Sequence, residues 1–420
     1  MTSQFTHNDS RLENANDAPP DNKMFTDTSW STWPIFDETE RRLLLEVLDS
    51  GKWWFGEKIQ RFESEFAEFQ GAHYAVTCTN GTTAIEMALR GLGVLPGDEV
   101  IVPPYSFIAT ASAVITIGAV PVFADIDQST LCLDPSAVQA KLSPRTRAII
   151  PVHVAGCMAD MEALNQIGRE HRLRVLEDSA HAWGSRRNHQ GAGTLGDCGT
   201  FSFQLSKNIT AGEGGVMVTN DEELADLCRS FTHCGRRKGA AWYDHDYLGS
   251  NLRMTEFQAA ILLAQLTRLE TQMKVRETNA EILNDALRRV PGIKIIGLNA
   301  RHTRRSYHMY VFRMDEMMLG ISRDELIERL NAVGIPASKG WYRPLYANGV
   351  FQNAHCEEPH GIKGALAGRG LDYRNEHCAV CEQVCRDAVW IPQQILLAER
   401  DQIARLAAMI LSVFESAQKV

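Results

Sequence analysis

The chain has 420 residues, of which 44% are hydrophobic and 23% are charged, and its formal net charge is -9. This composition is typical of a globular protein with ample apolar material for a core. The acidic balance argues against a nucleic-acid-binding protein, because phosphates attract surfaces rich in Lys and Arg. No apolar run approaches the length that crosses a bilayer. We therefore expect neither nucleic acid nor a membrane as a partner.

The first 29 residues are expected to be a disordered leader. Met1–Met24 carries Asn, Asp, Ser, Gln and a Pro-Pro pair, and it lacks the apolar stretch of a secretory signal. A cytoplasmic location with reduced cysteines follows from this expectation. The remaining length suits one large domain, placed at residues 30–270. A bridging helix and a smaller C-terminal domain are placed at 271–420.

The large domain begins with a helical stretch around Glu38–Leu48. From Tyr74 onward, short and nearly continuous apolar runs alternate with helical patterns. The expected strands are 74–79, 99–103, 120–125, 148–154, 174–178, 200–204 and 215–219, and helices are expected at 82–92, 135–142 and 161–171. This alternation predicts an α/β domain with a mostly parallel sheet. The last two strands have no helix between them, which predicts an antiparallel pair.

The C-terminal part begins with a long helical pattern over 253–289 that ends at Pro291-Gly292 and bridges to the smaller domain. That domain is expected to be α+β, with a strand at 307–312 and helices at 323–333 and 399–417. Cys378, Cys381 and Cys385 have the spacing of one helix face, and free cysteines pack as small hydrophobic groups. A zinc site would need His377 as a fourth ligand. We favour the helix and expect no metal.

The first motif that indicates chemistry is the stretch TNGTTA at residues 79–84, which follows a strand and opens a helix. Small residues at a helix start let backbone N–H groups approach an anion, and the helix dipole adds to the attraction. Thr82 and Thr83 are therefore candidates for a phosphate site. Taken alone, the same pattern more often marks an ordinary N-cap with a glycine turn.

The second motif, LEDSAH at 176–181, places Asp178 at the end of a buried strand. Ligands of open α/β sheets bind beyond the carboxyl ends of the strands. A carboxylate there can pair with a protonated ring nitrogen and keep a pyridinium charged, as pyridoxal enzymes require. A helix-capping aspartate is an equally good interpretation of the motif alone.

The third motif runs from Thr200 through Lys207 to the glycines at 212–215. A lysine just beyond an apolar strand can lose its proton near neutral pH if burial and positive charge lower its pKa, which a Schiff-base lysine requires. Ser202 offers a hydroxyl to a phosphate, and the glycines permit close backbone approach. An isolated lysine in a glycine-rich hairpin is usually a surface residue.

Together, a phosphate-type turn, a strand-ending Asp178 and a strand-following Lys207 stand in the order that fold-type I pyridoxal-phosphate enzymes use. From residue 33 to its end, the chain resembles the DegT/DnrJ/EryC1/StrS aminotransferases, which act on keto-sugars and keto-cyclitols. The stretches that carry the resemblance are FSFQLSKNITAGEGGVMVTN at 201–220, EVIVPPYSFIATASA at 99–113, LEDSAH at 176–181 and GSNLRMTEFQAAIL at 249–262. The resemblance implies pyridoxal 5'-phosphate as the cofactor.

It also implies roles for individual residues. Lys207 would hold the cofactor covalently and carry the proton, and Asp178 would pair with the pyridine nitrogen. His181 stands where many members have a Gln that contacts the phenolic oxygen of the cofactor. Phe107 matches the aromatic residue that stacks on the cofactor ring. Thr82 and Thr83 match the phosphate-binding backbone, with the hydroxyl of Ser202 beside it.

Asn251 matches an asparagine that reaches the cofactor phosphate of the neighbouring subunit, which implies a homodimer with shared active sites. Arg236, His308 and Tyr342 are candidates for contact with substrate. Arg gives bidentate recognition of a carboxylate, whereas Arg237 and Lys238 are expected to be solvated.

The retained lysine favours transamination over the family's dehydratases, which replace it by His. The pairs Phe203-Gln204 and Trp33-Pro34 and the run CGR at 234–236 resemble a subgroup of scyllo-inosose aminotransferases and 3-amino-5-hydroxybenzoate synthase. This implies L-glutamine or L-glutamate as donor and a keto-cyclitol or keto-sugar as acceptor, in amino-sugar or antibiotic biosynthesis. Two alternatives stay open: a dehydrating, aromatising enzyme like that synthase, and a non-catalytic partner subunit.

Overall fold

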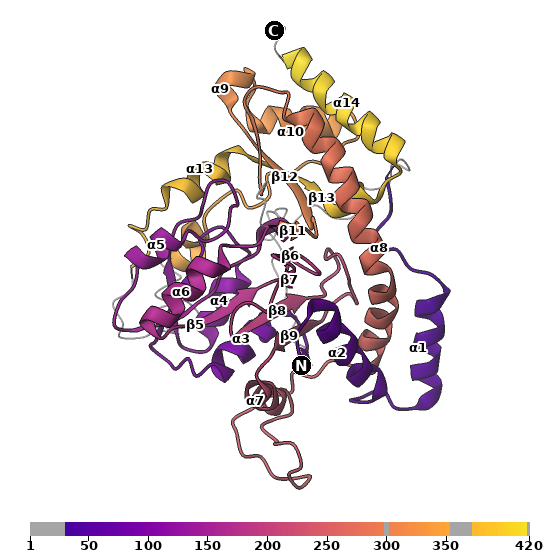
Figure 1. Ribbon diagram of the computed structural model, residues 1–420, viewed down its shortest axis with the longest axis vertical. Coiled ribbons are helices and arrows are strands. Elements are labelled where there is room, and N and C mark those ends of the chain that lie inside the picture. The colour runs from indigo at the N-terminus through magenta and orange to yellow at the C-terminus, as the bar shows by residue number, and fades with distance from the viewer. Residues whose placement is uncertain (1–29, 298–301, 353–371, 418–420) are drawn as a thin grey trace, which may run out of the picture.

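The computed structural model describes residues 30–297, 302–352 and 372–417. Its centre is a seven-stranded sheet with the order β1-β9-β8-β5-β4-β2-β3. Figure 1 labels three of these strands, β5, β8 and β9. The strands are β1 (Tyr74–Cys78), β2 (Glu99–Val102), β3 (Val120–Phe123), β4 (Thr146–Ile149), β5 (Arg174–Asp178), β8 (Cys198–Ser202) and β9 (Gly215–Thr219). Only β9 runs against its neighbours, β1 and β8. The predicted α/β class, the mostly parallel sheet and the antiparallel pair are confirmed.

Seven helices are associated with this sheet, and most of them begin at a residue whose side chain caps the first turn. Asp160 and Asp221, for example, accept hydrogen bonds from the backbone N–H groups of Ala163 and Leu224. The helices are α1 (Glu38–Ser50), α2 (Glu57–Gln70), α3 (Gly81–Gly91), α4 (Ala109–Thr116), α5 (Pro135–Ala140), α6 (Met161–His171) and α7 (Glu222–Thr232).

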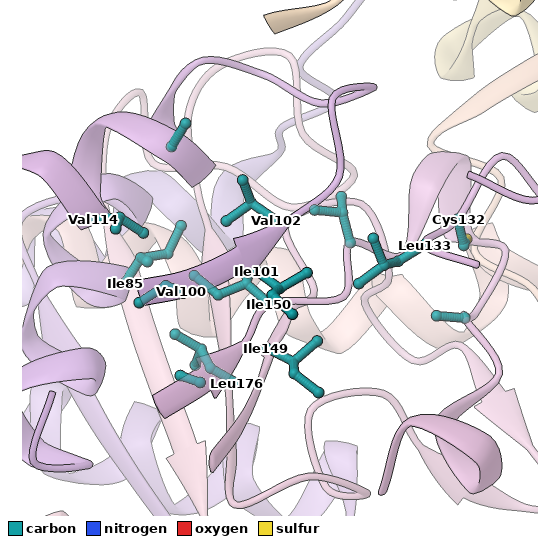
Figure 2. Packing of buried hydrophobic residues seen from close by; sticks show 14 of the residues in the cluster. Ile85, Val100, Ile101, Val102, Val114, Cys132, Leu133, Ile149, Ile150 and Leu176 are labelled. Atoms are coloured by element: carbon teal, nitrogen blue, oxygen red, sulfur yellow. The ribbon is translucent and has the colours of Figure 1, made fainter. Parts of the chain in front are cut away.

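The core lies between the parallel strands and these helices. Val100, Ile101 and Val102 of β2 are fully buried because both faces of the strand are covered. Figure 2 shows them packed with residues of the neighbouring strands and helices, among them Ile149 and Leu176. The continuous apolar runs of the sequence arise from this burial on both faces.

Several predicted strand boundaries are wrong by a few residues; the strand expected at 200–204, for example, is Cys198–Ser202. Two other strands differ for a reason that lies in the backbone. The strand expected at 148–154 ends at Ile149, because Pro151 has no N–H for a ladder. The chain then enters a 3-10 turn, η2 (Val154–Gly156), in which Ala155 has a φ of 52°. The strand expected at 307–312 is β12 (Met309–Met314), which starts later because Tyr307 has a left-handed φ of 47°. Non-glycine residues rarely adopt such a conformation inside a strand.

The bridging helix is α8 (Glu256–Leu287), close to the predicted 253–289. Its first half packs in the core cluster of α1, α2 and β9, whereas its residues from Ala280 onward pack in a second, C-terminal cluster. Figure 1 shows α8 running from the level of α1 and α2 up to α10 and α14. The domain boundary at residue 270 falls within this helix and stays a prediction.

The C-terminal cluster is built on a small antiparallel sheet in the order β10-β12-β13. A third, minor sheet has the order β11-β6-β7, with β6 between the other two strands. The remaining elements are β6 (Arg186–Arg187), β7 (Gln190–Gly191), β10 (Ile293–Ile295), β11 (His302–Arg304), β13 (Ala388–Pro392), α9 (Glu316–Leu319), α10 (Arg323–Ala332), η3 (Leu345–Ala347), α11 (Gly349–Gln352), α13 (Ala379–Asp387), η5 (Gln393–Leu397) and α14 (Arg400–Ala417).

The C-terminal cysteine triplet forms part of a helix and its cap, as predicted. Cys378 is the N-cap of α13, and Cys381 and Cys385 lie one turn apart on the buried side of that helix. Burial raises the pKa of the Cys378 thiol to about 12. Within the described residues, no group of three or more His, Cys, Asp or Glu side chains is placed to hold a metal ion. Across the same residues, every helix is too short or too polar to span a membrane. The predicted leader lies outside the described residues.

Candidate active site

Three chain segments converge at one edge of the central sheet. β1 and β8 both run opposite to β9, and β5 is parallel to β8, so these three strands end at the same edge. The turn into α3 follows β1, Asp178 closes β5, and the loop of Lys207 follows β8. This edge is where open α/β sheets bind ligands.

The start of α3 presents free backbone donors at this edge. Asn80 caps the helix: its side chain accepts from the N–H of Thr83, and its carbonyl accepts from Ala84. The N–H groups of Gly81 and Thr82 have no intrahelical acceptor, as at every helix N-terminus. Ser202 lies directly against this turn, because a Cβ at Gly81 would stand 2.8 Å from the Ser202 Cβ. Thr82, Thr83 and Ser202 are therefore brought together.

Asp178 is a buried carboxylate without a directly bonded cation among the described residues. Its Oδ2 accepts from the Thr110 hydroxyl at 2.8 Å, and its Oδ1 accepts from the N–H of Ala180 at 3.2 Å. Burial raises the pKa of Asp178, while these two hydrogen bonds and the charge of Lys207 oppose the rise. The protein thus donates one hydrogen bond to each carboxylate oxygen. A cationic ligand would supply the opposite charge with which the carboxylate can pair.

Lys207 is half-buried in the loop after β8. Its Nζ lies 5.9 Å from the centre of the Trp183 ring. Burial lowers the pKa of Lys207 to about 8, and the charge of Asp178 opposes this shift. A substantial fraction of the amine is therefore neutral near physiological pH, as a nucleophilic lysine requires.

Two buried imidazoles lie next to Lys207. The rings of His181 and His308 are 4.2 Å apart, and His181 stacks on Trp341 at 5.5 Å. Burial lowers the pKa of both histidines well below the usual value, and the charge of Lys207 lowers each further. Both rings are therefore neutral at physiological pH. The N–H of Ala155 donates to His181 Nδ1, so the proton of that ring sits on Nε2 and faces away as a donor.

Two further candidates occupy exposed positions close to this group. Phe107 is 60% exposed, and its carbonyl accepts from the N–H of Thr110, the residue that binds Asp178. Tyr342 is 52% exposed and lies under the guanidinium of Arg343. Trp341, its neighbour, is the side chain that reaches His181. The roles of Phe107 and Tyr342 stay predictions.

The remaining candidates lie between α7 and α8, in a segment that projects from the body of the molecule (Figure 1). Asn251 is exposed and forms a backbone bridge with His233. Arg236 is half-buried against Trp242. No hydrogen bond or ring contact joins Asn251 or Arg236 to Lys207, Asp178 or His181 in the described parts of the chain. Within one subunit these residues are not brought together.

The two basic neighbours of Arg236 have acidic partners. Arg237 pairs with Asp246 at 2.6 Å, and Lys238 lies 3.7 Å from Asp226. Both side chains are well exposed, which agrees with the expectation of a solvated loop.

Sequence reasoning missed several residues that support the site. Thr110 lies three residues after Phe107, within the stretch at 99–113 that carries the family resemblance. This spacing places Thr110 about one helical turn from Phe107 and could have marked it as a site residue. Asn208 follows Lys207 directly, and its side chain bonds both the Ser306 carbonyl and His308 Nδ1. Trp183 and Trp341 gave no signal, because aromatic residues usually pack in cores.

This arrangement fits a phosphorylated pyridine aldehyde. Free helix N–H groups and a serine hydroxyl suit its phosphate, a buried carboxylate suits a protonated ring nitrogen, and a lysine of lowered pKa suits its aldehyde. The cradle is tight: a Cβ at Gly215 would stand 2.2 Å from the Asn80 carbonyl oxygen. The glycines at these turns thus allow the segments to approach each other closely.

Comparisons with known proteins point to the same cofactor chemistry. Residues 34–409 match the model of the DegT/DnrJ/EryC1/StrS aminotransferase family. The chain is 38% identical over 382 residues to 3-amino-5-hydroxybenzoate synthase of Amycolatopsis mediterranei, covering 90% of this chain and 95% of the relative. It is 38% identical over 389 residues to a putative L-glutamine:3-amino-2,3-dideoxy-scyllo-inosose aminotransferase of Streptoalloteichus tenebrarius, covering 90% and 93%.

Solved structures agree over most of the chain. A crystal structure of 3-amino-5-hydroxybenzoic acid synthase superposes with a TM-score of 0.82 at 37% identity, covering 92% of this chain and 99% of that one. NtdA from Bacillus subtilis, solved with bound cofactor PMP, superposes with a TM-score of 0.76 at 26% identity, covering 90% and 82%. The chain therefore belongs to the DegT/DnrJ/EryC1/StrS family and is an aminotransferase that depends on pyridoxal 5'-phosphate.

Proposed function

We propose that this enzyme transfers the amino group of L-glutamine or L-glutamate to the ketone of a keto-cyclitol or keto-sugar, in the biosynthesis of an amino sugar or aminocyclitol antibiotic. The observation that carries the proposal is the placement of Lys207, Asp178 and the α3 turn at one sheet edge. The names of the relatives, several of which specify glutamine and an inosose, support the choice of substrates.

Each residue of the site has a separate role in the proposed amino transfer. Lys207 would hold the cofactor, and its amine, whose pKa burial lowers, would carry the proton to and from the substrate carbon. Asp178 holds the proton on the ring nitrogen, and Thr110 fixes its carboxylate. Gly81, Thr82 and Ser202 bind the phosphate. The cofactor supplies an electron sink when bound.

His181 has a defined hydrogen-bonding role in this scheme. Its Nε2–H is a donor, because Nδ1 accepts from Ala155, and its low pKa keeps the ring neutral. A neutral donor stabilises the phenolic oxygen of the cofactor without placing a second cation beside Lys207. Trp341 holds the ring by stacking.

We also propose a homodimer in which Asn251 completes the site of the neighbouring subunit. Exposed aromatic residues support an interface around this segment: Trp54 is 55% exposed and Trp242 76%. Trp54 contacts His233, which pairs with Asn251. Such a cluster of exposed aromatic side chains is typical of an interaction surface. A cytoplasmic location stays a prediction.

A mixing experiment tests the shared site. Lys207→Ala and Asn251→Ala are each expected to be inactive as homodimers. In a mixed dimer, one of the two sites combines an intact Lys207 with an intact Asn251, so activity should return on mixing. Continued inactivity of verified mixed dimers would refute the shared site.

A screen of amino donors and keto acceptors tests the function itself. Glutamine should remove the visible absorbance of the bound cofactor, and a keto-cyclitol or keto-sugar should restore it. No response to any amino donor would refute transamination.

The second candidate is a dehydrating and aromatising synthase. The 38% identity to 3-amino-5-hydroxybenzoate synthase and the His181 position favour considering it. Incubation with aminodehydroshikimate would then give an aromatic product with ultraviolet absorbance, which an aminotransferase alone does not form. The non-catalytic alternative has no support, because Lys207 and Asp178 are both present.

A further inference from the structure

A buried arginine near the active site has no acidic partner. Arg276 of α8 is 0% exposed, and its Nε and Nη2 both donate to Gln393 Oε1, at 2.9 and 2.5 Å. No carboxylate pairs with it within the described residues. Burial lowers the pKa of Arg276 to about 9. Proteins rarely bury a charge without pairing it, so this cation calls for an explanation.

The bonding of Gln393 shows what kind of group is missing. A guanidinium only donates hydrogen bonds, so the amide oxygen of Gln393 must face Arg276 and its nitrogen must face elsewhere. Gln393 Nε2 and Arg276 Nη1 are both buried without an acceptor in the described chain. Each of these groups is a buried donor that lacks an acceptor, and the oxygen of an anion would supply one.

This donor pair lies beside the catalytic group. β12 and β13 pair Met309 with Pro392, so His308 and Gln393, the residues next to this pair, lie at the same end of the ladder. The charge of Arg276 contributes to the lowered pKa of His308. Trp183, which contacts both His308 and Lys207, has a third buried donor, Nε1, without an acceptor within the described residues.

An aromatic side chain links the arginine to the lysine loop. The ring of Trp33 lies 5.7 Å from the guanidinium of Arg276. Its Nε1 donates to the carbonyl of Leu205, two residues before Lys207, at 2.8 Å. Trp33 therefore contacts both Arg276 and the loop that carries Lys207.

We propose that Arg276 Nη1, Gln393 Nε2 and Trp183 Nε1 form the subsite for the carboxylate of the amino donor, a role that rests on the proposed function. The loop of Arg236 is a weaker choice within this subunit, since Arg237 and Lys238 are already paired and Arg236 does not contact the Lys207 group. The subsite would place the negative end of an amino acid beside neutral His308 and direct its amino group toward the cofactor that Lys207 would hold.

Gln393→Glu is the decisive substitution. A glutamate of the same shape keeps the oxygen that binds Arg276 and replaces the free donor by a second oxygen, so the protein itself supplies the anion. The fold should be as stable as wild type or more so, because a buried cation gains a partner. The probe is glutaramate, which is glutamine without its amino group and cannot react with the cofactor. Calorimetry on the cofactor-loaded, full-length enzyme measures its affinity.

Wild type should bind glutaramate at least about tenfold more tightly than neutral glutaramide, and Gln393→Glu should weaken glutaramate binding by about ten- to a hundredfold. The matched control is Gln139→Glu, on exposed α5 beside His171, which should bind as wild type does. Equal affinity for the two probes in wild type overturns the subsite, and so does an unchanged affinity for glutaramate in Gln393→Glu.

A second variant tests the subsite if Gln393→Glu does not fold. Trp183→Phe keeps an aromatic side chain but replaces the indole by a smaller ring that lacks the third donor. It should weaken glutaramate binding several-fold; unaltered binding contradicts the subsite. The proposed function fails separately: if glutamine leaves the cofactor absorbance of wild type unchanged, transamination is refuted. If the absorbance responds while the binding results are negative, only the subsite is refuted.

Discussion

Thr110→Val removes one hydrogen bond from Asp178 and also the acceptor of the buried Ser106 hydroxyl, which lies 2.7 Å away. Thr110 is fully buried, and its hydroxyl donates to the Asp178 carboxylate at 2.8 Å. Valine has nearly the same shape. A hydrogen bond to a charged group contributes about 1.5–3 kcal/mol, which corresponds to about 1–2 pKa units. The pKa of Asp178, which burial already raises, should therefore rise by about that amount.

The sign of the effect follows from the direction of this shift. A carboxyl whose pKa is higher in the folded than in the unfolded protein opposes folding at pH values above its folded pKa. That penalty disappears as the pH falls below both values. Cofactor-free Thr110→Val should thus lose about 1.5–3 kcal/mol of unfolding free energy at pH 7. The loss should shrink in acid, where Asp178 is protonated in both proteins.

Two assays measure these effects. Stopped-flow measurement of the glutamine-dependent loss of cofactor absorbance should show an acid limb shifted upward by about 1–2 pH units. Urea unfolding of the cofactor-free protein at pH 7 and in acid gives the stability difference. Thr116→Val in the same helix is the matched control, because the exposed Thr116 hydroxyl bonds the Ser112 carbonyl and Glu86 rather than Asp178. A pH profile of Thr110→Val that superposes on that of wild type would refute the role given to Thr110.

Three other substitutions test separate parts of the site and fold. Asp178→Asn should slow the glutamine half-reaction by about 100-fold or more while the cofactor still binds; an unimpaired stopped-flow rate contradicts its role. Gly81→Ala places a Cβ 2.8 Å from Ser202, and should weaken cofactor affinity at least about tenfold by absorbance titration; unchanged affinity would exclude this turn as the phosphate site. Phe66→Ala empties a fully buried position among three phenylalanines and should cost about 3–5 kcal/mol in urea unfolding, a value below 1 kcal/mol being inconsistent with the packing.

The pH dependence of Lys207 supplies one more test. Because burial lowers its pKa to about 8, its neutral fraction rises with pH and is half-maximal there. In the cofactor-free enzyme, labelling of Lys207 by an amine-specific reagent should follow a curve with that midpoint. A midpoint near 10.5, the ordinary lysine value, would show that the site does not desolvate the amine.

Much of the fold was predictable because local pattern and tertiary structure agree. α6 and β5 have the bounds expected from the sequence, Met161–His171 and Arg174–Asp178. There an Asp cap opens an amphipathic helix, and an apolar run buried on both faces follows it. Two strand boundaries were predicted wrongly because a single residue interrupts the strand. Pro151 lacks an N–H for the ladder, and Tyr307 has a left-handed φ.

The site was predictable in its strand-end residues and less so in the residues that support them. Asp178 and Lys207 carry a signal because each follows a buried strand. The partnership of Thr110 with Asp178 depends on a contact across 68 positions, and that of Arg276 with Gln393 on one across 117. Neither pair has a spacing that a sequence pattern can reveal. Such contacts follow from the packing of whole elements.

The attachment site of the cofactor tests the central claim most directly. Borohydride reduction of the purified, yellow enzyme should fix the cofactor covalently, and mass spectrometry of its peptides should find the added mass on Lys207 alone. Lys207→Ala, treated in the same way, should carry none. Attachment at another lysine, or an equal yield of modified peptide in Lys207→Ala, would contradict the account.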